Sequence, residues 1–168
     1  MRRNDYVKMT KNLKAKPGLL KFCTMANKFG PWVYGVLYGL FVLSLLPVSM
    51  MAAVRVLLVP LGSYFLVQLV NMMLDYPRPY EKFNVKPALP PDKEGGHSIP
   101  CKQAYWYTMI GLVFTIILVF PFKIIGIVLL AGAAGLCAIR VIGGLHFTRD
   151  VVIGVVLAVV FAYVGFMS

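Results

Sequence analysis

Acidic residues, histidines and cysteines are all scarce in this sequence. Only 6 of its 168 residues are Asp or Glu, 2 are His and 3 are Cys, whereas 17 are Lys or Arg. The cysteines, Cys23, Cys101 and Cys137, form no Cys-x-x-Cys pair, which argues against a disulfide framework and against a zinc site. No internal repeat or low-complexity segment is present. We therefore expect one bundle rather than several domains.

Charged residues of either sign are also few. They make up 14% of the chain, whereas 60% of the residues are hydrophobic and the mean hydropathy is +0.78. A soluble domain of this length cannot bury so much apolar surface, so the composition is typical of an integral membrane protein. It predicts an all-α, polytopic membrane helix bundle.

Apolar runs divide the chain into five segments. A membrane-spanning helix needs about 17 to 25 apolar residues, so we predict about five transmembrane helices. The small residues Ala131–Gly135 allow a neighbouring backbone to approach closely. This favours a central position for the short run that contains them, over the alternative that they are mild apolar filler. The five runs are Val33–Ala53, Val56–Leu74, Ala104–Phe122, Ile124–Ile139 and Val151–Met167.

Basic residues are concentrated near the N-terminus. Residues 1–30 contain eight Lys or Arg and one acid, Asp5. Nucleic-acid binding is one interpretation of such a segment, but beside a membrane bundle it favours contact with an anionic lipid surface, and we predict no nucleic-acid partner. After Pro17-Gly18, apolar residues at helical spacing predict an interfacial amphipathic helix before the first span. These residues are Leu19, Phe22, Cys23, Ala26 and Phe29.

The predicted organisation is a basic N-terminal segment, 1–30, followed by a single transmembrane domain, 31–168, with a long loop over 75–103. If five spans alternate, 15 of the 17 basic residues lie on the side of the N-terminus and the long loop, and only Arg55 and Lys123 lie on the other. The positive-inside bias places the first side in the cytoplasm. The N-terminal segment stays open in this count, because it can lie on either surface.

An unusual polar cluster, Arg140, His146 and Asp150, lies between the last two apolar runs. Ionisable residues at the membrane edge are costly and usually functional. His146 and Asp150 are four residues apart, so they share a face if the last helix begins near His146. Asp150 can then accept from one imidazole nitrogen and leave the other as a nucleophile. The structural alternative is that His146 is a buried cap paired to Asp150.

Two further polar segments lie on the same side of the predicted bundle. Arg78-Pro79 follows the second apolar run, where an arginine alone often only marks the headgroup level. Gly95-Gly96-His97 precedes the third run; the glycines let backbone N–H groups approach an anion, and His97 can donate a proton. A loop histidine alone is more often a surface residue. Together with the polar cluster, these segments supply the cations, nucleophile and acid that a phosphate group requires.

On these residues the chain resembles the type 2 phosphatidic acid phosphatase superfamily. That family's first motif is Lys, six residues, Arg-Pro; Arg78-Pro79 matches its end, and Asn71 stands in place of the lysine. The second motif is Pro-Ser-Gly-His, of which Gly96-His97 matches the end, with Glu94 and Gly95 where Pro and Ser are usual.

The third motif of the family is Ser-Arg, five residues, His, three residues, Asp. Arg140, His146 and Asp150 match it with the correct spacing, and Ile139 replaces the serine. The order of motifs and spans also agrees with the family over roughly residues 31–168. The third motif is therefore the most specific part of the resemblance.

The resemblance implies a multi-pass membrane phosphatase that needs no metal or other cofactor. It gives His146 the role of a nucleophile that forms a phosphohistidine, Asp150 that of its orienter, and His97 that of the proton donor. The substrate is a phosphorylated membrane lipid: phosphatidic acid, phosphatidylglycerophosphate or a polyprenyl (pyro)phosphate. The implied phosphate-binding residues are Arg78, Arg140, Gly95, Gly96 and, as a neutral donor, Asn71, with Lys93, Lys82 or Arg149 as auxiliary charges.

Two alternatives remain open. A non-catalytic or altered-specificity relative would bind anionic lipid headgroups through the arginines. A metal enzyme would use His97, His146 and Asp150 as a two-histidine, one-carboxylate set. The adjacent arginines disfavour a bound cation, which ranks the metal enzyme last.

Overall fold

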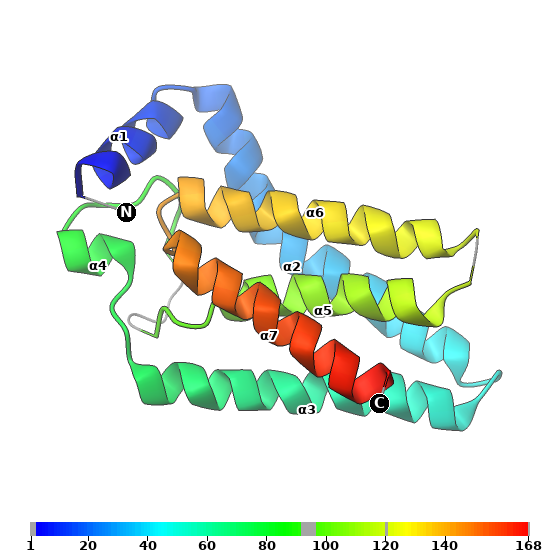
Figure 1. Ribbon diagram of the computed structural model, residues 1–168. Helices are drawn as coiled ribbons and strands as arrows, with labels where there is room; N and C mark the ends of the chain where they lie inside the picture. The colour runs from blue at the N-terminus through cyan, green and yellow to red at the C-terminus, as the bar shows by residue number, and fades with distance from the viewer. Residues whose placement is uncertain (1–2, 92–96, 120, 168) are drawn as a thin grey trace.

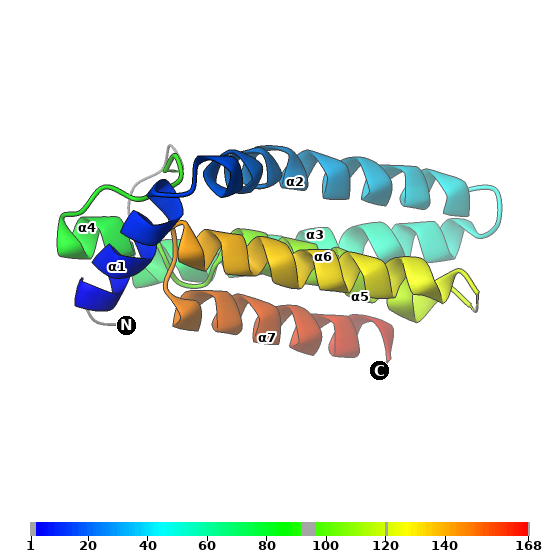
Figure 2. The same ribbon diagram turned by 90° about the horizontal axis from the view of Figure 1, so that it is seen from above.

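All of the secondary structure in the described part of the chain is helical. The computed structural model describes residues 3–91, 97–119 and 121–167 (Figure 1). Two shorter helices, α1 and α4, lie at one end of a bundle formed by the others (Figures 1 and 2). The helices are α1 Arg3–Lys14, α2 Pro17–Leu45, α3 Met50–Leu74, α4 Pro79–Phe83, α5 Lys102–Ile117, α6 Lys123–Ile142 and α7 Thr148–Phe166.

Among the described residues, four segments have the length and apolar composition to cross a membrane: α2, α6, α7 and the stretch Met50–Phe83 that contains α3. The third apolar run of the sequence forms α5, which has only 16 residues. At 1.5 Å per residue it is about 24 Å long, somewhat less than the hydrocarbon core of a bilayer. The predicted polytopic helical bundle is therefore confirmed, with four long helices around one shorter one.

The central position belongs to α5, which lies among α2, α3, α6 and α7 (Figures 1 and 2). Tyr105, Met109, Ile110 and Val113 of α5 are fully buried. Two polar groups in this core lie within hydrogen-bond distance of each other, as a membrane interior favours: the hydroxyls of Ser63 and Tyr105 are 2.5 Å apart. α5 does not need a lipid-facing surface, because its neighbours cover it.

The small residues that predicted a central position for Ile124–Ile139 have a narrower role. One face of α6 packs closely on α5: a Cβ added to Gly111 of α5 would lie 2.8 Å from Leu130 Cδ2. The opposite face of α6 is exposed, with Ile127 and Val128. α6 therefore lies on the outside of the bundle. Of the two glycines in Ala131–Gly135, only Gly132 has a close neighbour: a Cβ added there would lie 2.8 Å from the Tyr34 hydroxyl of α2.

The N-terminal segment contains a helix before the first span, but not at the predicted residues. The predicted interfacial helix over 19–29 is the first part of α2, which continues through Pro31 to Leu45. The separate helix is α1, which buries Tyr6, Thr10 and Leu13. Because α2 passes residue 30 without a break, the part of the basic segment from Pro17 onward and the first span form one continuous helix.

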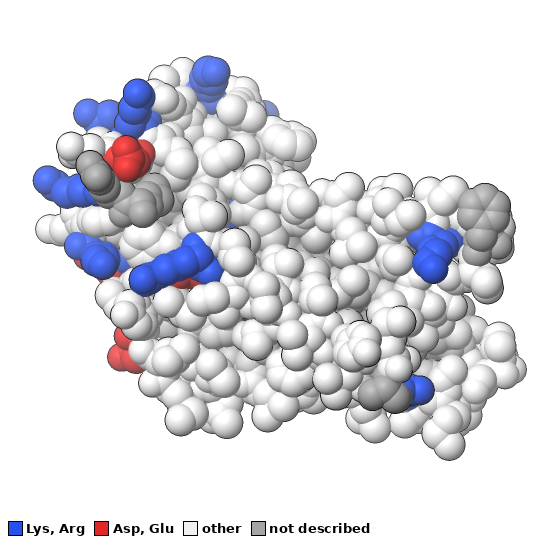
Figure 3. All heavy atoms as spheres, in the orientation of Figure 1, with Lys and Arg blue, Asp and Glu red and all other residues white. Residues whose placement is uncertain are grey.

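Charged groups are concentrated at the α1 and α4 end of the bundle (Figure 3). Arg55 and Lys123, at the N-terminal ends of α3 and α6, lie at the opposite end. There Arg55 Nε donates to Gly165 O over 2.9 Å. The N-terminus, the long loop and the segment from Arg140 to Asp150 thus lie together.

Candidate active site

The turn between α6 and α7 and the two helix ends beside it carry three buried ionisable side chains, Arg140, His146 and Asp150. Gly144 has a φ of +79°, which glycine adopts without steric cost. Arg140 O accepts hydrogen bonds from Leu145 N at 2.9 Å and from His146 N at 3.4 Å. α7 begins at Thr148. His146 therefore lies on the turn itself, between Arg140 at the end of α6 and Asp150 in the first turn of α7.

His146 is only 2% exposed, and its two ring nitrogens face different groups. Nδ1 lies 3.2 Å from Ser98 O and 3.5 Å from Ser98 Oγ. Nε2 lies 3.5 Å from Nη2 of Arg140. Because a carbonyl oxygen only accepts, Nδ1 is assigned the proton, and Nε2 carries the lone pair. The unprotonated nitrogen thus faces a guanidinium, where an anion would be held.

Asp150 reaches His146 through Ser98. The Ser98 hydroxyl donates to Asp150 Oδ2, which also accepts from Phe147 N at 3.2 Å. Arg149 Nε donates to Oδ1 at 3.2 Å. The direct contact predicted between Asp150 and His146 is thus replaced by a relay. The reason is local: α7 starts after His146, so the face-sharing rule for helical residues does not apply to the pair.

Ser98 is a candidate site residue that the sequence did not indicate. It is fully buried, and its backbone N donates to Tyr76 O at 2.8 Å. This places its hydroxyl between the loop and the His146 turn. The family motifs gave no reason to select it, because the residue after the motif histidine is not part of the pattern.

Arg140 is also held by a residue that no motif indicates. Its Nη1 donates to Asn27 Oδ1 of α2 at 2.9 Å, and the side chain is 2% exposed. One guanidinium group therefore links α2 to His146. A half-buried asparagine on an apolar helix carries no sequence signal for such a role.

Asn71 has a different role from the predicted phosphate donor. It is fully buried, and its Nδ2 donates to His97 O at 2.7 Å and to Pro100 O at 3.0 Å. Both amide hydrogens are therefore committed to the backbone of the loop. Asn71 fastens the loop to the end of α3 instead of offering a donor to a phosphate group.

His97 is a loop residue that lies beside the C-terminal end of α3, and its side chain is partly exposed to solvent. Its side chain is 35% exposed, and Nδ1 lies 3.2 Å from Asp75 Oδ1. Its backbone has a φ of +50°. It is the neighbouring Ser98, and not His97, whose contact with His146 the structure records. The assignment of His97 as proton donor remains a prediction.

Arg78 is 3% exposed at the start of α4, where its backbone N donates to Glu81 Oε2 at 2.9 Å. The predicted auxiliary cations Lys82 and Arg149 line one cavity of about 150 Å³ with Phe147 and Thr148. The Arg149 guanidinium also lies 4.9 Å from the centroid of the Tyr76 ring. Gly95, Gly96 and Lys93 lie outside the described residues.

The metal-enzyme alternative requires His97, His146 and Asp150 to converge on one ion. Within residues 3–91, 97–119 and 121–167, no group of three His, Cys, Asp or Glu side chains is arranged to hold a metal. The His97 ring instead lies beside Asp75, whereas Asp150 accepts from Ser98. The metal alternative thus has no geometric support.

Fold and site together define a class: polytopic helical membrane proteins with a buried histidine held beside an arginine at one end of the bundle. The chain matches the PAP2 superfamily over residues 52–167, and so it belongs to that superfamily. The suspected resemblance is confirmed. No curated protein matches the chain. Membership implies phosphatase-type activity on lipid-like phosphoesters.

The structure also suggests a second register for the family's Pro-Ser-Gly-His pattern. Pro100-Cys101-Lys102-Gln103 keeps the proline of that pattern and leads into α5. Cys101 N donates to Asp150 O at 3.0 Å, so this segment touches the site. In this register Gln103 takes the place of the histidine, and a carboxamide cannot protonate a leaving group.

Proposed function

We propose that the protein is a membrane phosphatase that hydrolyses a phosphate or pyrophosphate monoester of a membrane lipid, with His146 as nucleophile. The observation that carries this proposal is the buried arrangement of His146. Nδ1 faces Ser98 O, and Nε2 faces Arg140. The guanidinium beside Nε2 places a cation where the phosphoryl oxygens of a substrate would lie.

In the proposed first step, the lone pair of His146 Nε2 forms a bond to phosphorus. The P–O bond to the lipid breaks, and its electron pair leaves on the lipid oxygen, which takes up a proton from the proposed donor, His97. The imidazole becomes cationic, and the Ser98–Asp150 pair stabilises that charge, as an orienting carboxylate does in other nucleophile–histidine systems. Arg140 Nη2, 3.5 Å from Nε2, is placed to hold the phosphoryl oxygens.

In the proposed second step, water attacks the phosphorus of the phosphohistidine. The N–P bond breaks, its electron pair returns to His146 Nε2, the water gives up one proton to His97, and inorganic phosphate is released. Hydrolysis thus requires no metal ion, because cationic side chains offset the phosphoryl charge throughout. Arg78 is buried at the same end of the bundle and is the second proposed cation.

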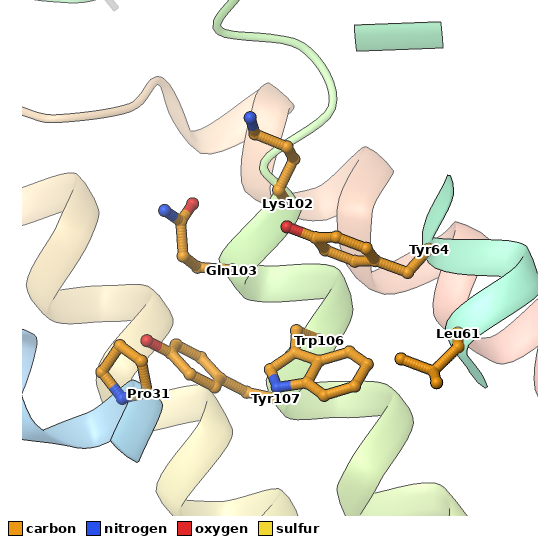
Figure 4. Close-up of a pocket in the computed structure, with 7 residues that line it drawn as sticks. All are labelled: Pro31, Leu61, Tyr64, Lys102, Gln103, Trp106 and Tyr107. Carbon is orange, nitrogen blue, oxygen red and sulfur yellow. The ribbon is translucent and has the colours of Figure 1, made fainter. Parts of the chain in front are cut away.

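A lipid substrate is supported by a cavity of about 390 Å³ among α2, α3 and α5. Lys102 lies at one end of it, and the apolar Leu61 and Trp106 lie at the other (Figure 4). Lys102 opens α5, directly after Cys101, whose backbone contacts Asp150. The cavity therefore offers an apolar wall for a hydrocarbon chain near the site. Its lining residues are Pro31, Leu61, Tyr64, Lys102, Gln103, Trp106 and Tyr107.

Phosphate release by the purified, reconstituted protein tests this proposal. The substrate panel is phosphatidic acid, phosphatidylglycerophosphate, a polyprenyl phosphate and a polyprenyl pyrophosphate, each with and without chelator. We expect turnover that is insensitive to chelator and falls by at least about 1,000-fold in His146→Asn, which keeps the approximate size but removes the nucleophile. Equal release by wild type and His146→Asn would exclude the nucleophilic role.

A non-catalytic headgroup-binding relative is the second candidate, and specific observations favour it. His97 pairs with Asp75, Asn71 is committed to the loop, and Gln103 occupies the histidine position of the alternative register. Such a protein would retain phosphatidic acid in a native mass spectrum while releasing no more phosphate than His146→Asn does. Wild-type turnover above that of the variant would reject this candidate.

The site is proposed to face the cytoplasm, because the end of the bundle that contains it carries most of the basic residues. The native cysteines Cys23, Cys101 and Cys137 are buried, so an introduced thiol has a low background. Lys82→Cys, on the exposed surface of α4, should resist a membrane-impermeant thiol reagent in intact cells and react after lysis. Labelling in intact cells would place the site outside.

A further inference from the structure

Helix α1 packs directly on the turn that carries His146. Tyr6 is fully buried, and its hydroxyl donates to Gly144 O at 3.2 Å and lies 3.4 Å from Val85 O. A Cβ added to Gly144 would lie 2.9 Å from Thr10 Cγ2. Because Gly144 is only two residues before His146, α1 fixes the backbone that positions the proposed nucleophile.

The same helix also holds the loop against this turn. Leu13 is buried in a cluster with Leu89 of the loop and Leu145 of the turn. Gly143 O accepts from Leu89 N at 3.3 Å. Burial raises the pKa of Tyr6 to about 12, and the nearby Tyr80 adds to the shift. The Tyr6 hydroxyl therefore remains a donor at any physiological pH.

The outward face of α1 is basic. Arg3, Lys8, Lys11 and Lys14 are all exposed, whereas Tyr6 and the other buried residues face the turn. This end of the molecule is where charged side chains gather (Figure 3). Since the long helices place it at a membrane surface, the chemistry that fits is a layer of anionic lipid headgroups.

Helix α1 itself lies in a part of the chain that the family match does not include. The match covers residues 52–167, whereas α1 covers Arg3–Lys14. Asn27, which accepts from Arg140, also precedes the match. The N-terminal residues are therefore an addition to the matched bundle that contacts its proposed catalytic groups.

We propose that α1 is a clamp that anionic lipid headgroups hold against the Gly143–Phe147 turn, so that turnover depends on the surface charge of the bilayer. The expected dependence of turnover on the surface charge of the bilayer rests on the proposed function. The seating of α1 does not, because it can be measured without any substrate. In a neutral bilayer the basic face loses its counter-charge, and α1 leaves the turn more often. The expected result is a less ordered His146 backbone and slower turnover.

The experiment uses the full chain in liposomes of phosphatidylcholine with increasing fractions of phosphatidylglycerol, at a fixed small fraction of substrate. Hydrogen exchange of residues 3–14 and 143–147 is measured beside phosphate release. Wild type should gain protection in both segments and several-fold in turnover as phosphatidylglycerol increases. The variant Lys8→Gln/Lys11→Gln should show neither gain. Lys123→Gln, which removes an exposed charge at the opposite end, should behave as wild type.

Tyr6→Phe separates seating from charge, because it keeps the basic face and removes the hydrogen bond to Gly144. It should keep lipid-dependent protection of 3–14 but lose much of that at 143–147. Lipid-dependent protection with no turnover in any liposome would support the clamp and reject the proposed phosphatase. Turnover and exchange that are both independent of phosphatidylglycerol would overturn the clamp alone. Protection by soluble polyglutamate but not by phosphatidylglycerol would also overturn it and indicate an acidic protein partner.

Discussion

The two halves of the proposed site differ in how firmly the structure holds them. On the nucleophile side, Arg140, His146 and Asp150 are each at most 2% exposed. Partners from α2 and from the loop fix them. On the leaving-group side, the side chains of His97 and Asp75 are 35% and 73% exposed and pair with each other. The comparison teaches that the proposed nucleophile is held in the core, whereas the proposed proton donor lies on a solvent-facing segment.

The largest expected effect comes from the nucleophile side. Arg140→Gln removes the guanidinium that faces His146 Nε2 and contacts Asn27. We expect kcat/KM to fall about 100- to 1,000-fold, the usual cost of losing a charge-stabilising donor. Phosphate release from reconstituted protein measures it, and Arg55→Gln at the opposite end is the control. A loss below tenfold would show that Arg140 serves packing alone.

A somewhat smaller effect is expected for the relay. Ser98→Ala removes the hydroxyl that donates to Asp150 and leaves a buried carboxylate short of a partner. We expect kcat to fall by about 10- to 100-fold, and the free energy of unfolding to fall by about 1–3 kcal/mol. The pH–rate profile separates the two roles, because a lost relay changes the apparent pKa of the histidine, whereas simple destabilisation does not. Ser44→Ala, on α2, is the matched control.

The hydrogen bonds by which Asn71 joins the end of α3 to the loop are expected to matter mainly for stability. Asn71→Ala deletes two hydrogen bonds to the backbone carbonyls of His97 and Pro100. Leaving buried acceptors without a donor costs about 1–3 kcal/mol, which thermal unfolding in detergent can measure. Asn71→Lys should not raise activity, even though it restores the family's lysine, because the hydrogen bonds between residue 71 and the loop backbone are lost. A gain in kcat/KM for Asn71→Lys would assign the position to phosphate binding.

The smallest expected effect probes the solvent-facing side. Gln103→His introduces an imidazole at the histidine position of the alternative register. We expect a several-fold gain on a lipid monophosphate, where the leaving alkoxide needs a proton, and little change on a pyrophosphate, whose leaving phosphate needs less assistance. His97→Ala is measured in parallel on the same two substrates. A loss of about 100-fold on the monophosphate in that variant would show that His97 is the acid after all.

Much of the fold follows from the apolar runs, because burying them in lipid and satisfying every backbone group requires helices. The helix boundaries could be predicted from the sequence less well. Apolar residues after Pro17 predicted a separate interfacial helix, yet they continue into α2, because Pro31 did not end the helix. The centre of the bundle was also misplaced, since small residues report close approach and not position, and α5 takes the place expected for α6.

The sequence by itself determined the class of the protein and its proposed nucleophile. A chain with so few charges must fold in a membrane, and the spacing of Arg140, His146 and Asp150 is local information. Only the tertiary structure decided how these residues are held. Ser98, Asn27 and Tyr6 contact the site from segments far apart in the chain. No spacing in the sequence predicts the partners of these hydroxyl, amide and phenol groups, because a hydrogen bond depends on where the packed helices bring its two atoms.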